Sequence, residues 1–226
     1  MSLKLIYFKM RALAEAPQML MHCYGIDYQY LMSWEHFDDV WANVKPTITF
    51  QQLPMLEVDG EAQICQSVAI LQYLENRAGI AISDPVKAAQ ASAILQSAQE
   101  LFAPLNPAIN FAIGDDFMAK KEAMRPGLSG RFSDLARCLE SGRGKFFTDD
   151  TARAAEFATY HHLDLSKLLD PSLVQEFPRL MAFISDMESL PGMASYLSKR
   201  PKLIDVGTAP KLVIEDVAHP TGMKKT

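Results

Sequence analysis

Apolar and polar positions alternate with two different periods in the first third of the chain. A dense apolar run over residues 3–8 predicts a buried strand, and alternation from Ile26 to Met32 predicts a second strand. Between them, residues 13–24 carry apolar side chains at helical spacing, and Gly25 follows as a typical helix end. A strand, a crossover helix and a strand predict a parallel pair with a right-handed connection.

A hairpin is predicted in the segment FQQLPMLEVDGEAQICQSVAIL, which covers residues 50–71. Strand-like residues flank an Asp-Gly pair, which favours a two-residue turn. Pro54 cannot donate to a sheet, so we expect it to open the first strand of the hairpin, and the Leu53–Pro54 bond is a candidate for the cis form. Ser67 is suited to cap the helix that follows. The Trp-rich, acidic stretch before the hairpin predicts no regular element.

The pattern becomes helical beyond the hairpin. Ser83 or Asp84 can cap a helix that holds Pro85 in its first turn, and strand signals nearly vanish after it. Apolar stripes at helical spacing, separated by Gly and Pro, predict five or six helices. We expect Pro104 and Pro107 to bend or end the first of them.

These elements divide the chain into three predicted parts. Residues 1–79 predict an α/β domain with a mixed four-stranded sheet, and residues 85–200 predict an all-α domain. Residues 201–226 form a tail in which Leu212, Val213 and Ile214 suggest docking on the body of the protein.

Composition narrows the classes of function. With 226 residues, 49% hydrophobic and 22% charged, the chain has the composition of a globular protein. A net charge of −5 argues against a nucleic-acid partner. No apolar run approaches the about 20 residues that a membrane span needs. The amino terminus enters a strand pattern without the features of a signal peptide, so we expect a cytoplasmic location.

The cysteines argue against a disulfide framework and against a metal site. Cys23, Cys65 and Cys138 are odd in number, widely spaced and outside any CxxC pattern, which favours reduced thiols. His161 and His162 are adjacent on a predicted helix and lack the i, i+4 spacing of a metal pair, so we interpret them as ordinary helix positions.

Several short motifs occur at defined places in the predicted elements. They are Tyr7-Phe8 at the end of the first strand, Arg11 and Glu15 at the start of the first helix, Trp41 with Lys45, QLPMLEVDG from Gln52 to Gly60, and Gln66-Ser67 before AILQYL. Together they resemble glutathione transferases, particularly the sigma-like class, and a looser resemblance continues to about Arg200. The resemblance implies a thioredoxin-like domain that binds glutathione, a helical domain that shapes a hydrophobic co-substrate site, and a homodimer.

The resemblance also implies how glutathione is held. In the family, the proline of this segment is cis and exposes the backbone of the preceding residue, here Leu53 before Pro54, to the cysteinyl part of the peptide. The γ-glutamyl carboxylate lies at the helix N-terminus beside Gln66 and Ser67. The contacts implied at the glycyl end come from Trp41, Lys45 and Gln52.

Tyr7 is the implied catalytic residue. A cysteine thiol has a pKa near about 8.5, so a phenol that donates a hydrogen bond to the sulfur favours the reactive thiolate. The thiolate would attack a small hydrophobic electrophile, a conjugation typical of detoxification, with glutathione as co-substrate and no metal. The apolar surface for the electrophile is assigned to Met10, Leu13, Phe102 and the tail.

Three positions depart from the family pattern. Leu13 stands where sigma- and alpha-like enzymes commonly place an arginine that helps to stabilise the thiolate. Ser92 or a nearby glutamine replaces the partner-subunit acid that meets the γ-glutamyl amine. The usual capping box of the helical domain aligns with residues 153–156, so we expect Thr151 or Asp150 to cap instead.

Two alternative functions remain open at this point. One is a glutathione-dependent isomerase of the prostaglandin type. The other is a non-catalytic binding or structural protein with the same fold. Tyr7 favours an enzyme, whereas Leu13 and the altered subunit contact leave room for the alternatives.

Overall fold

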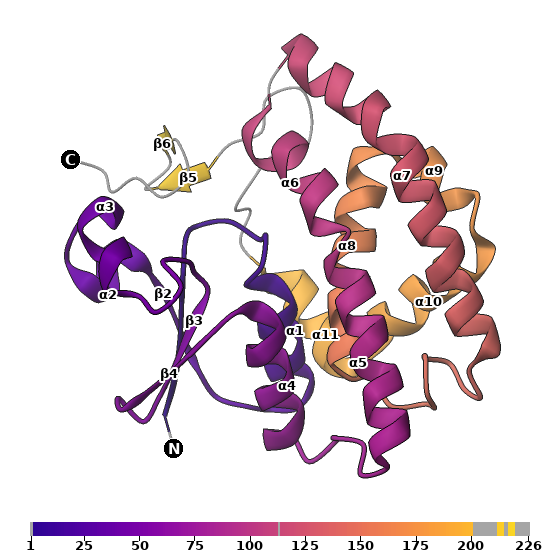
Figure 1. The fold of residues 1–226 in the computed structure, drawn as a ribbon, viewed down its shortest axis with the longest axis horizontal. Helices are drawn as coiled ribbons and strands as arrows, with labels where there is room; N and C mark the ends of the chain where they lie inside the picture. Colours follow the sequence, from indigo (N-terminus) through magenta and orange to yellow (C-terminus); the bar gives the residue numbers. More distant parts are fainter. Residues whose placement is uncertain (1, 113, 201–211, 215–216, 220–226) are drawn as a thin grey trace.

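A four-stranded mixed sheet forms the amino-terminal half of the protein. The computed structural model describes residues 2–112, 114–200, 212–214 and 217–219 (Figure 1). The sheet has the order β2-β1-β3-β4, with β1 parallel to β2 and antiparallel to β3, and β3 antiparallel to β4. This confirms the predicted topology. The strands are β1 (Leu3–Tyr7), β2 (Gln29–Met32), β3 (Met55–Val58) and β4 (Ala62–Cys65).

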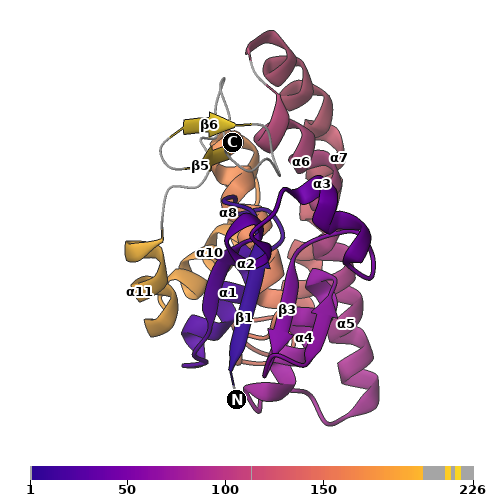
Figure 2. The same ribbon diagram turned by 90° about the vertical axis from the view of Figure 1, so that its left-hand side faces the viewer.

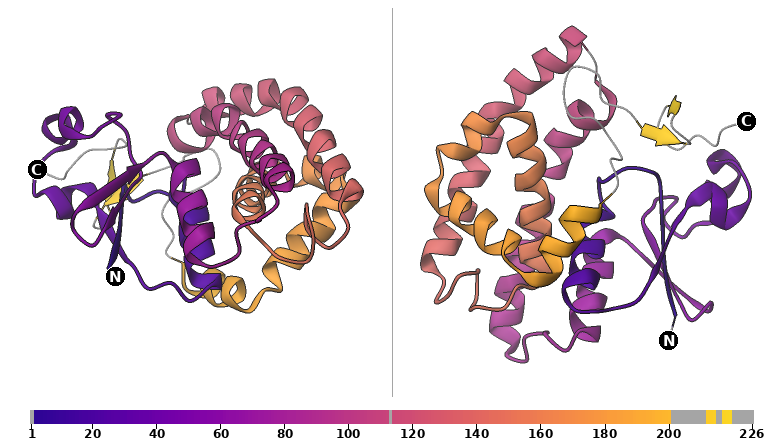
Figure 3. Two further views of the ribbon diagram at one scale, coloured as in Figure 1. Left: turned by 60° about the horizontal axis from the view of Figure 1, so that its bottom comes forward. Right: turned by 180° about the vertical axis from the view of Figure 1, so that it is seen from behind.

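Two helices lie between the sheet and the helical half, as Figure 3 shows. They are α1 (Glu15–Cys23) and α4 (Ser67–Arg77), and they pack against each other. The stretch that we predicted to be irregular instead forms three short elements: α2 (Ser33–Phe37), α3 (Trp41–Val44) and η1 (Lys45–Thr47). Elements of three to five residues are too short to produce a periodic apolar pattern, so that prediction was wrong.

Seven helices occupy the described residues of the carboxyl-terminal half, more than the five or six that we predicted. The apolar pattern in the sequence did not separate short helices from the helices beside them, which explains the lower predicted number. Helix α8 is central, with contacts to α5, α6, α9 and α10 of its own half and to α1 and α4 of the sheet half. None of the helices in the described residues is both long and apolar enough to cross a membrane. The seven are α5 (Pro85–Gln99), α6 (Phe102–Phe111), α7 (Gly114–Ser141), α8 (Ala154–Leu169), α9 (Pro171–Gln175), α10 (Pro178–Glu188) and α11 (Pro191–Lys199).

Helix termini follow the sequence signals in part. Asp84 caps α5, and its Oδ1 accepts from the N–H groups of Val86 at 3.0 Å and Lys87 at 2.9 Å, as predicted. Pro104 and Pro107 lie inside the separate helix α6 and do not end α5. Pro104 falls in the first turn of α6, where a backbone N–H has no helical partner to lose.

The tail residues that the structure describes form a small two-stranded sheet. Strand β5 (Leu212–Ile214) pairs antiparallel with β6 (Val217–His219). The docking of the tail on the body stays a prediction.

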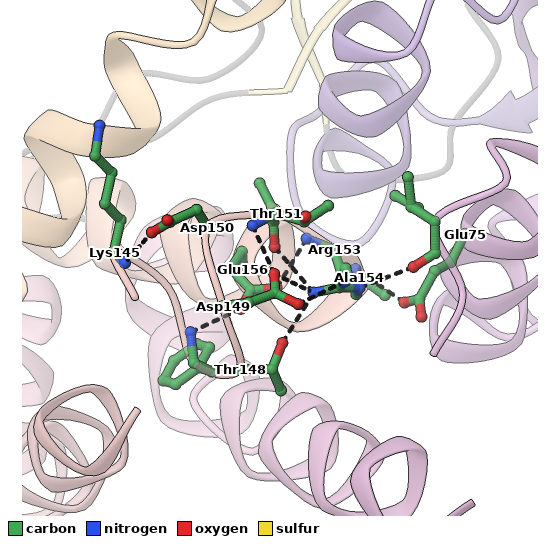
Figure 4. A network of polar contacts seen from close by, with 12 residues as sticks. Glu75, Lys145, Thr148, Asp149, Asp150, Thr151, Arg153, Ala154 and Glu156 are labelled. Atoms are coloured by element: carbon green, nitrogen blue, oxygen red, sulfur yellow. Dashed lines mark hydrogen bonds and ion pairs between the residues drawn. The ribbon is translucent and has the colours of Figure 1, made fainter. Parts of the chain in front are cut away.

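A polar network at the start of α8 ties the two halves together (Figure 4). Arg153, the N-cap residue, donates to the Ile80 carbonyl at 2.8 Å and to the two carboxylate oxygens of Asp149 at 2.8 and 2.9 Å. Glu156 accepts from the Arg153 N–H at 2.8 Å, and Glu75 of α4 accepts from the Ala154 N–H at 3.1 Å. Backbone N–H groups at this terminus are therefore satisfied by carboxylates.

The prediction of Thr151 or Asp150 as the cap of α8 was therefore wrong. Asp150 instead accepts from the Lys145 N–H at 2.8 Å. Glu156 is buried, and this burial raises the pKa of its carboxyl to about 7 although the surrounding backbone N–H groups and Arg153 lower it.

A second charged cluster crosses the same boundary and consists of Arg11, Glu15, Asp164 and Arg200. Arg11 bonds Asp164 and also donates to Glu15 at 3.2 Å, which is the i, i+4 contact expected from the sequence. Arg200 donates to Asp164 at 3.0 Å and to Glu15 at 3.3 Å. Burial raises the pKa of Asp164, but Arg11 and Arg200 together hold it below its usual range.

Helices α1 and α11 approach so closely that one position between them requires glycine. Figure 2 shows α11 on one flank of the sheet half and α5 on the other. A Cβ on Gly192 would overlap the Cα of Cys23 and would lie 2.8 Å from the His22 carbonyl oxygen. These are backbone atoms, so relief requires a shift of one helix.

We therefore predict that Gly192→Ala destabilises the protein by about 1–3 kcal/mol, the usual cost of overpacking. Urea unfolding followed by circular dichroism would measure the change. Gly130→Ala is the matched control, because a Cβ at Gly130 in α7 meets nothing within 4 Å, and it should stabilise by about 0.5–1 kcal/mol. Equal stability of Gly192→Ala and wild type would contradict the close approach.

Candidate active site

Tyr7 is the buried last residue of β1, only 4% exposed. Its hydroxyl oxygen accepts a hydrogen bond from the backbone N–H of Leu13 at 3.3 Å. Burial raises the pKa of Tyr7, and the Leu13 N–H lowers it by less. The phenol is therefore neutral at neutral pH, and its own O–H proton stays free to be donated.

Aromatic packing holds the strand end that carries Tyr7. The ring of Phe8 lies 5.4 Å from that of Tyr7 and meets the ring of Trp41 edge to face at 5.3 Å. The hydroxyl of Tyr30 donates to the Phe8 carbonyl at 2.9 Å. Trp41, the first residue of α3, therefore packs against Phe8, which in turn packs against Tyr7.

The Leu53–Pro54 bond is cis, as we predicted, and directly precedes β3. Leu53 is buried, and within the described part of the chain its backbone N–H has no hydrogen-bond partner. This leaves a free donor beside the sheet for an extended peptide.

The amino terminus of α4 has no side-chain cap. Gln66, with φ 74°, is the N-cap residue, and the buried Ser67 is the first helical residue, so the prediction of Ser67 as N-cap was wrong by one position. The side-chain amide of Gln66 donates to Gln52 at 3.2 Å. Uncapped N–H groups and the helix dipole make this terminus suitable for an anion.

Lys45 and Gln52 line the same surface hollow, of about 390 Å³, together with Thr49, Phe50 and Gln51. The structure therefore brings together Lys45, Gln52 and, through the amide contact described above, Gln66. Lys45 supplies the positive charge of this hollow.

The three residues predicted for the electrophile site differ in exposure. Met10 is buried, at 2% exposed, whereas Leu13 and Phe102 are half-buried and can present apolar surface. The backbone contact of Leu13 with Tyr7 was not predicted from the sequence, where only the Leu13 side chain was considered. No sequence signal marks that contact, because every residue except proline has an N–H.

Ser92 has a partner within its own chain. It accepts a hydrogen bond from the Gln72 amide at 3.2 Å, which joins α4 to α5. The replacement of the partner-subunit acid by Ser92 or a nearby glutamine stays a prediction.

Comparisons with known proteins identify the family of the chain. The family models "Glutathione S-transferase, N-terminal domain" and "Glutathione S-transferase, C-terminal domain" match residues 3–76 and 106–200. The hematopoietic prostaglandin D synthase of Gallus gallus is 34% identical over 214 residues, which covers 88% of this chain and 96% of that protein. The chain belongs to the glutathione S-transferase family. Glutathione S-transferase 1 of Ascaris suum is 28% identical over 203 residues, covering 88% and 97% of the two chains.

Solved structures of the glutathione S-transferase family share the fold. The glutathione S-transferase of Ascaris lumbricoides is 27% identical, with a TM-score of 0.79 over 89% of this chain and 98% of that one. A monomeric glutathione S-transferase of Necator americanus, 24% identical, has a TM-score of 0.78 over 89% and 98%. The predicted family, fold and enzyme class, a glutathione transferase, are confirmed.

We predict that Ser67→Ala raises the Kd for glutathione roughly 10- to 100-fold, because a hydrogen bond to a charged group contributes about 1.5–3 kcal/mol. Isothermal titration calorimetry would measure the affinity. Ser198→Ala, on the exposed end of α11, is the control and should bind like wild type. An unchanged Kd in Ser67→Ala would contradict the binding of the γ-glutamyl carboxylate at the N-terminus of α4.

Proposed function

We propose that this protein conjugates the thiolate of glutathione to small hydrophobic electrophiles, with Tyr7 as the donor that activates the thiol. The observation that carries the proposal is the state of Tyr7. Its hydroxyl oxygen already accepts from the Leu13 N–H at 3.3 Å, and burial keeps the phenol neutral. A hydroxyl in this state acts as a hydrogen-bond donor toward an acceptor sulfur.

Glutathione would lie along the edge that the site residues form. The backbone of Leu53, beside the cis Pro54, pairs with the cysteinyl part in a β-like manner. The γ-glutamyl carboxylate binds at the N-terminus of α4, where Gln66 and Ser67 add side-chain donors. The glycyl carboxylate is assigned to the hollow of Lys45 and Gln52, with Trp41 nearby.

The chemistry then needs little from the protein beyond charge stabilisation and position. A hydrogen bond from Tyr7 that lowers the thiol pKa by about two units supplies roughly 2.7 kcal/mol, enough for the thiolate to predominate at neutral pH. The thiol proton leaves to solvent. The sulfur lone pair forms a bond to the electrophilic carbon, and the leaving group departs with its bonding electrons. Leu13 and Phe102, with the more deeply buried Met10 behind them, are assigned to hold the electrophile.

A second candidate function is glutathione-dependent isomerisation. It is favoured by the 34% identity to a hematopoietic prostaglandin D synthase, which also supports a sigma-like assignment. In such a reaction glutathione is regenerated, so no thiol is consumed. A non-catalytic binding role is less favoured because Tyr7 keeps its position and its free proton.

The proposal also includes the organisation of the chain. We assign glutathione binding to residues 1–79 and the electrophile site to residues 85–200; residues 201–226 form a C-terminal tail that lies mostly outside the described residues. A homodimer acting in the cytoplasm in detoxification is the setting that the family suggests. The described structure contains the three cysteines as free thiols, consistent with that compartment.

We predict that Tyr7→Phe lowers kcat/KM for conjugation of glutathione to a chloronitrobenzene roughly 10- to 100-fold, the worth of one hydrogen bond to a charged sulfur of about 1.5–3 kcal/mol. The Kd for glutathione should change little, because the tripeptide keeps its other contacts. Steady-state kinetics and calorimetry on the purified protein would measure both quantities.

Tyr73→Phe, a half-buried tyrosine on α4, is the matched control and should keep full activity. Full activity in Tyr7→Phe would refute the role of Tyr7. Glutathione binding by wild type without turnover of any electrophile in a broad panel would favour the binding role. Turnover without thiol consumption would favour the isomerase.

A further inference from the structure

His161 on α8 bonds the backbone segment that supports Tyr7. Its ring is 1% exposed, and its Nε2 lies 2.5 Å from the carbonyl oxygen of Ala12. A carbonyl oxygen only accepts, so Nε2 must carry the proton and donate it. The other ring nitrogen, Nδ1, is buried and has no partner within the described part of the chain. Burial of an unpaired nitrogen costs free energy, which the bond from Nε2 to the Ala12 carbonyl partly offsets.

The carbonyl of Ala12 and the N–H of Leu13 belong to the same peptide group. A trans peptide is planar, and its C=O and N–H point in opposite directions. His161 therefore holds one end of this group while the other end donates to the Tyr7 hydroxyl at 3.3 Å. Ala12 has φ 27°, an unusual backbone conformation for alanine, so the orientation of the peptide needs support.

Helix α8 also contacts Arg11, the residue before Ala12. Asp164 follows His161 by three positions, one helical turn, and bonds Arg11. Arg11 and Ala12 are thus both fixed from the helical half. Helix α8 therefore anchors the loop between β1 and α1 directly before Leu13, whose N–H contacts Tyr7.

We infer that His161 is a positioning residue for thiol activation, acting through the Ala12–Leu13 peptide group on the Tyr7 hydroxyl. The inference rests on the proposed function of Tyr7. Donation by His161 fixes the direction of the Leu13 N–H, and polarisation along the chain of hydrogen bonds makes that N–H a stronger donor. A more strongly solvated phenol oxygen makes the Tyr7 proton a better donor to the glutathione sulfur.

The state of the imidazole agrees with this role. Burial lowers the pKa of His161 well below its usual value, and His162, Arg11 and Arg200 lower it further. The ring therefore stays neutral at physiological pH, with its proton on Nε2. This contact also gives the site a route of thiol stabilisation that uses the backbone of Leu13 and not its side chain.

The test measures the pKa of the thiol of bound glutathione, by titrating its thiolate ultraviolet absorbance on the purified protein. We expect His161→Leu, which keeps the volume but removes the donor, to raise this pKa by about half a unit, equivalent to a roughly threefold lower ratio of thiolate to thiol at a given pH. His161→Gln should restore the value, because its amide N–H reaches a similar place as Nε2. His162→Leu is the matched control on the same helix, equally buried, and should leave the thiol pKa unchanged.

The outcomes separate this inference from the proposed function. A thiol pKa that rises in Tyr7→Phe but not in His161→Leu overturns the role of His161 and leaves that of Tyr7 intact. A thiol pKa that does not change in Tyr7→Phe overturns the proposed function itself. Equal rises in His161→Leu and His162→Leu indicate general loosening and also overturn the inference.

A measurement on wild type covers the case in which His161→Leu does not fold. Nitrogen NMR of the imidazole should show His161 as the neutral tautomer with the proton on Nε2. A proton on Nδ1 would overturn the inference, because Nε2 could then not donate to Ala12.

Discussion

The hydrogen bond from the Leu13 N–H to the Tyr7 hydroxyl, 3.3 Å long, is the contact on which the candidate site depends. A buried phenol resists ionisation, so Tyr7 cannot serve as a base at neutral pH. With one lone pair of its oxygen already engaged, the hydroxyl has its proton left for a ligand. The same atom thus accepts from the protein and donates outward. This arrangement suits a sulfur that gains negative charge.

That contact lies within the sheet half, but His161 of α8 bonds the peptide group that donates it, so the placement of α8 matters for chemistry that takes place at the sheet. Arg153 bonds the Ile80 carbonyl at the start of α8, and Asp164 bonds Arg11 near its middle. Buried ion pairs add little net stability, because the lost hydration of the charges offsets their attraction. Their effect here is to fix one orientation of the helix. His161 lies between these two anchors on α8.

Local signals in the sequence were sufficient to predict the sheet and its hairpin. Pro54 could be placed at the opening of a strand because it lacks an N–H, and the cap at Asp84 followed from the neighbouring proline. What could not be predicted depends on contacts between distant segments. At the N-terminus of α8, Glu156 accepts from the backbone N–H of Arg153, the N-cap residue. We did not expect this contact, because arginine is not a typical N-cap residue. The contact of His161 with Ala12 joins positions 149 residues apart, and no spacing rule links them.

The proposed function requires the glutathione sulfur to meet the Tyr7 hydroxyl at the end of β1. A crystal structure of the protein with bound glutathione tests it most directly. We expect the sulfur within hydrogen-bond distance of the Tyr7 oxygen, the cysteinyl backbone paired with Leu53, and the γ-glutamyl carboxylate at the N-terminus of α4. A tripeptide bound elsewhere, or a sulfur turned away from Tyr7 with that oxygen contacting only Leu13, would refute the role proposed for Tyr7.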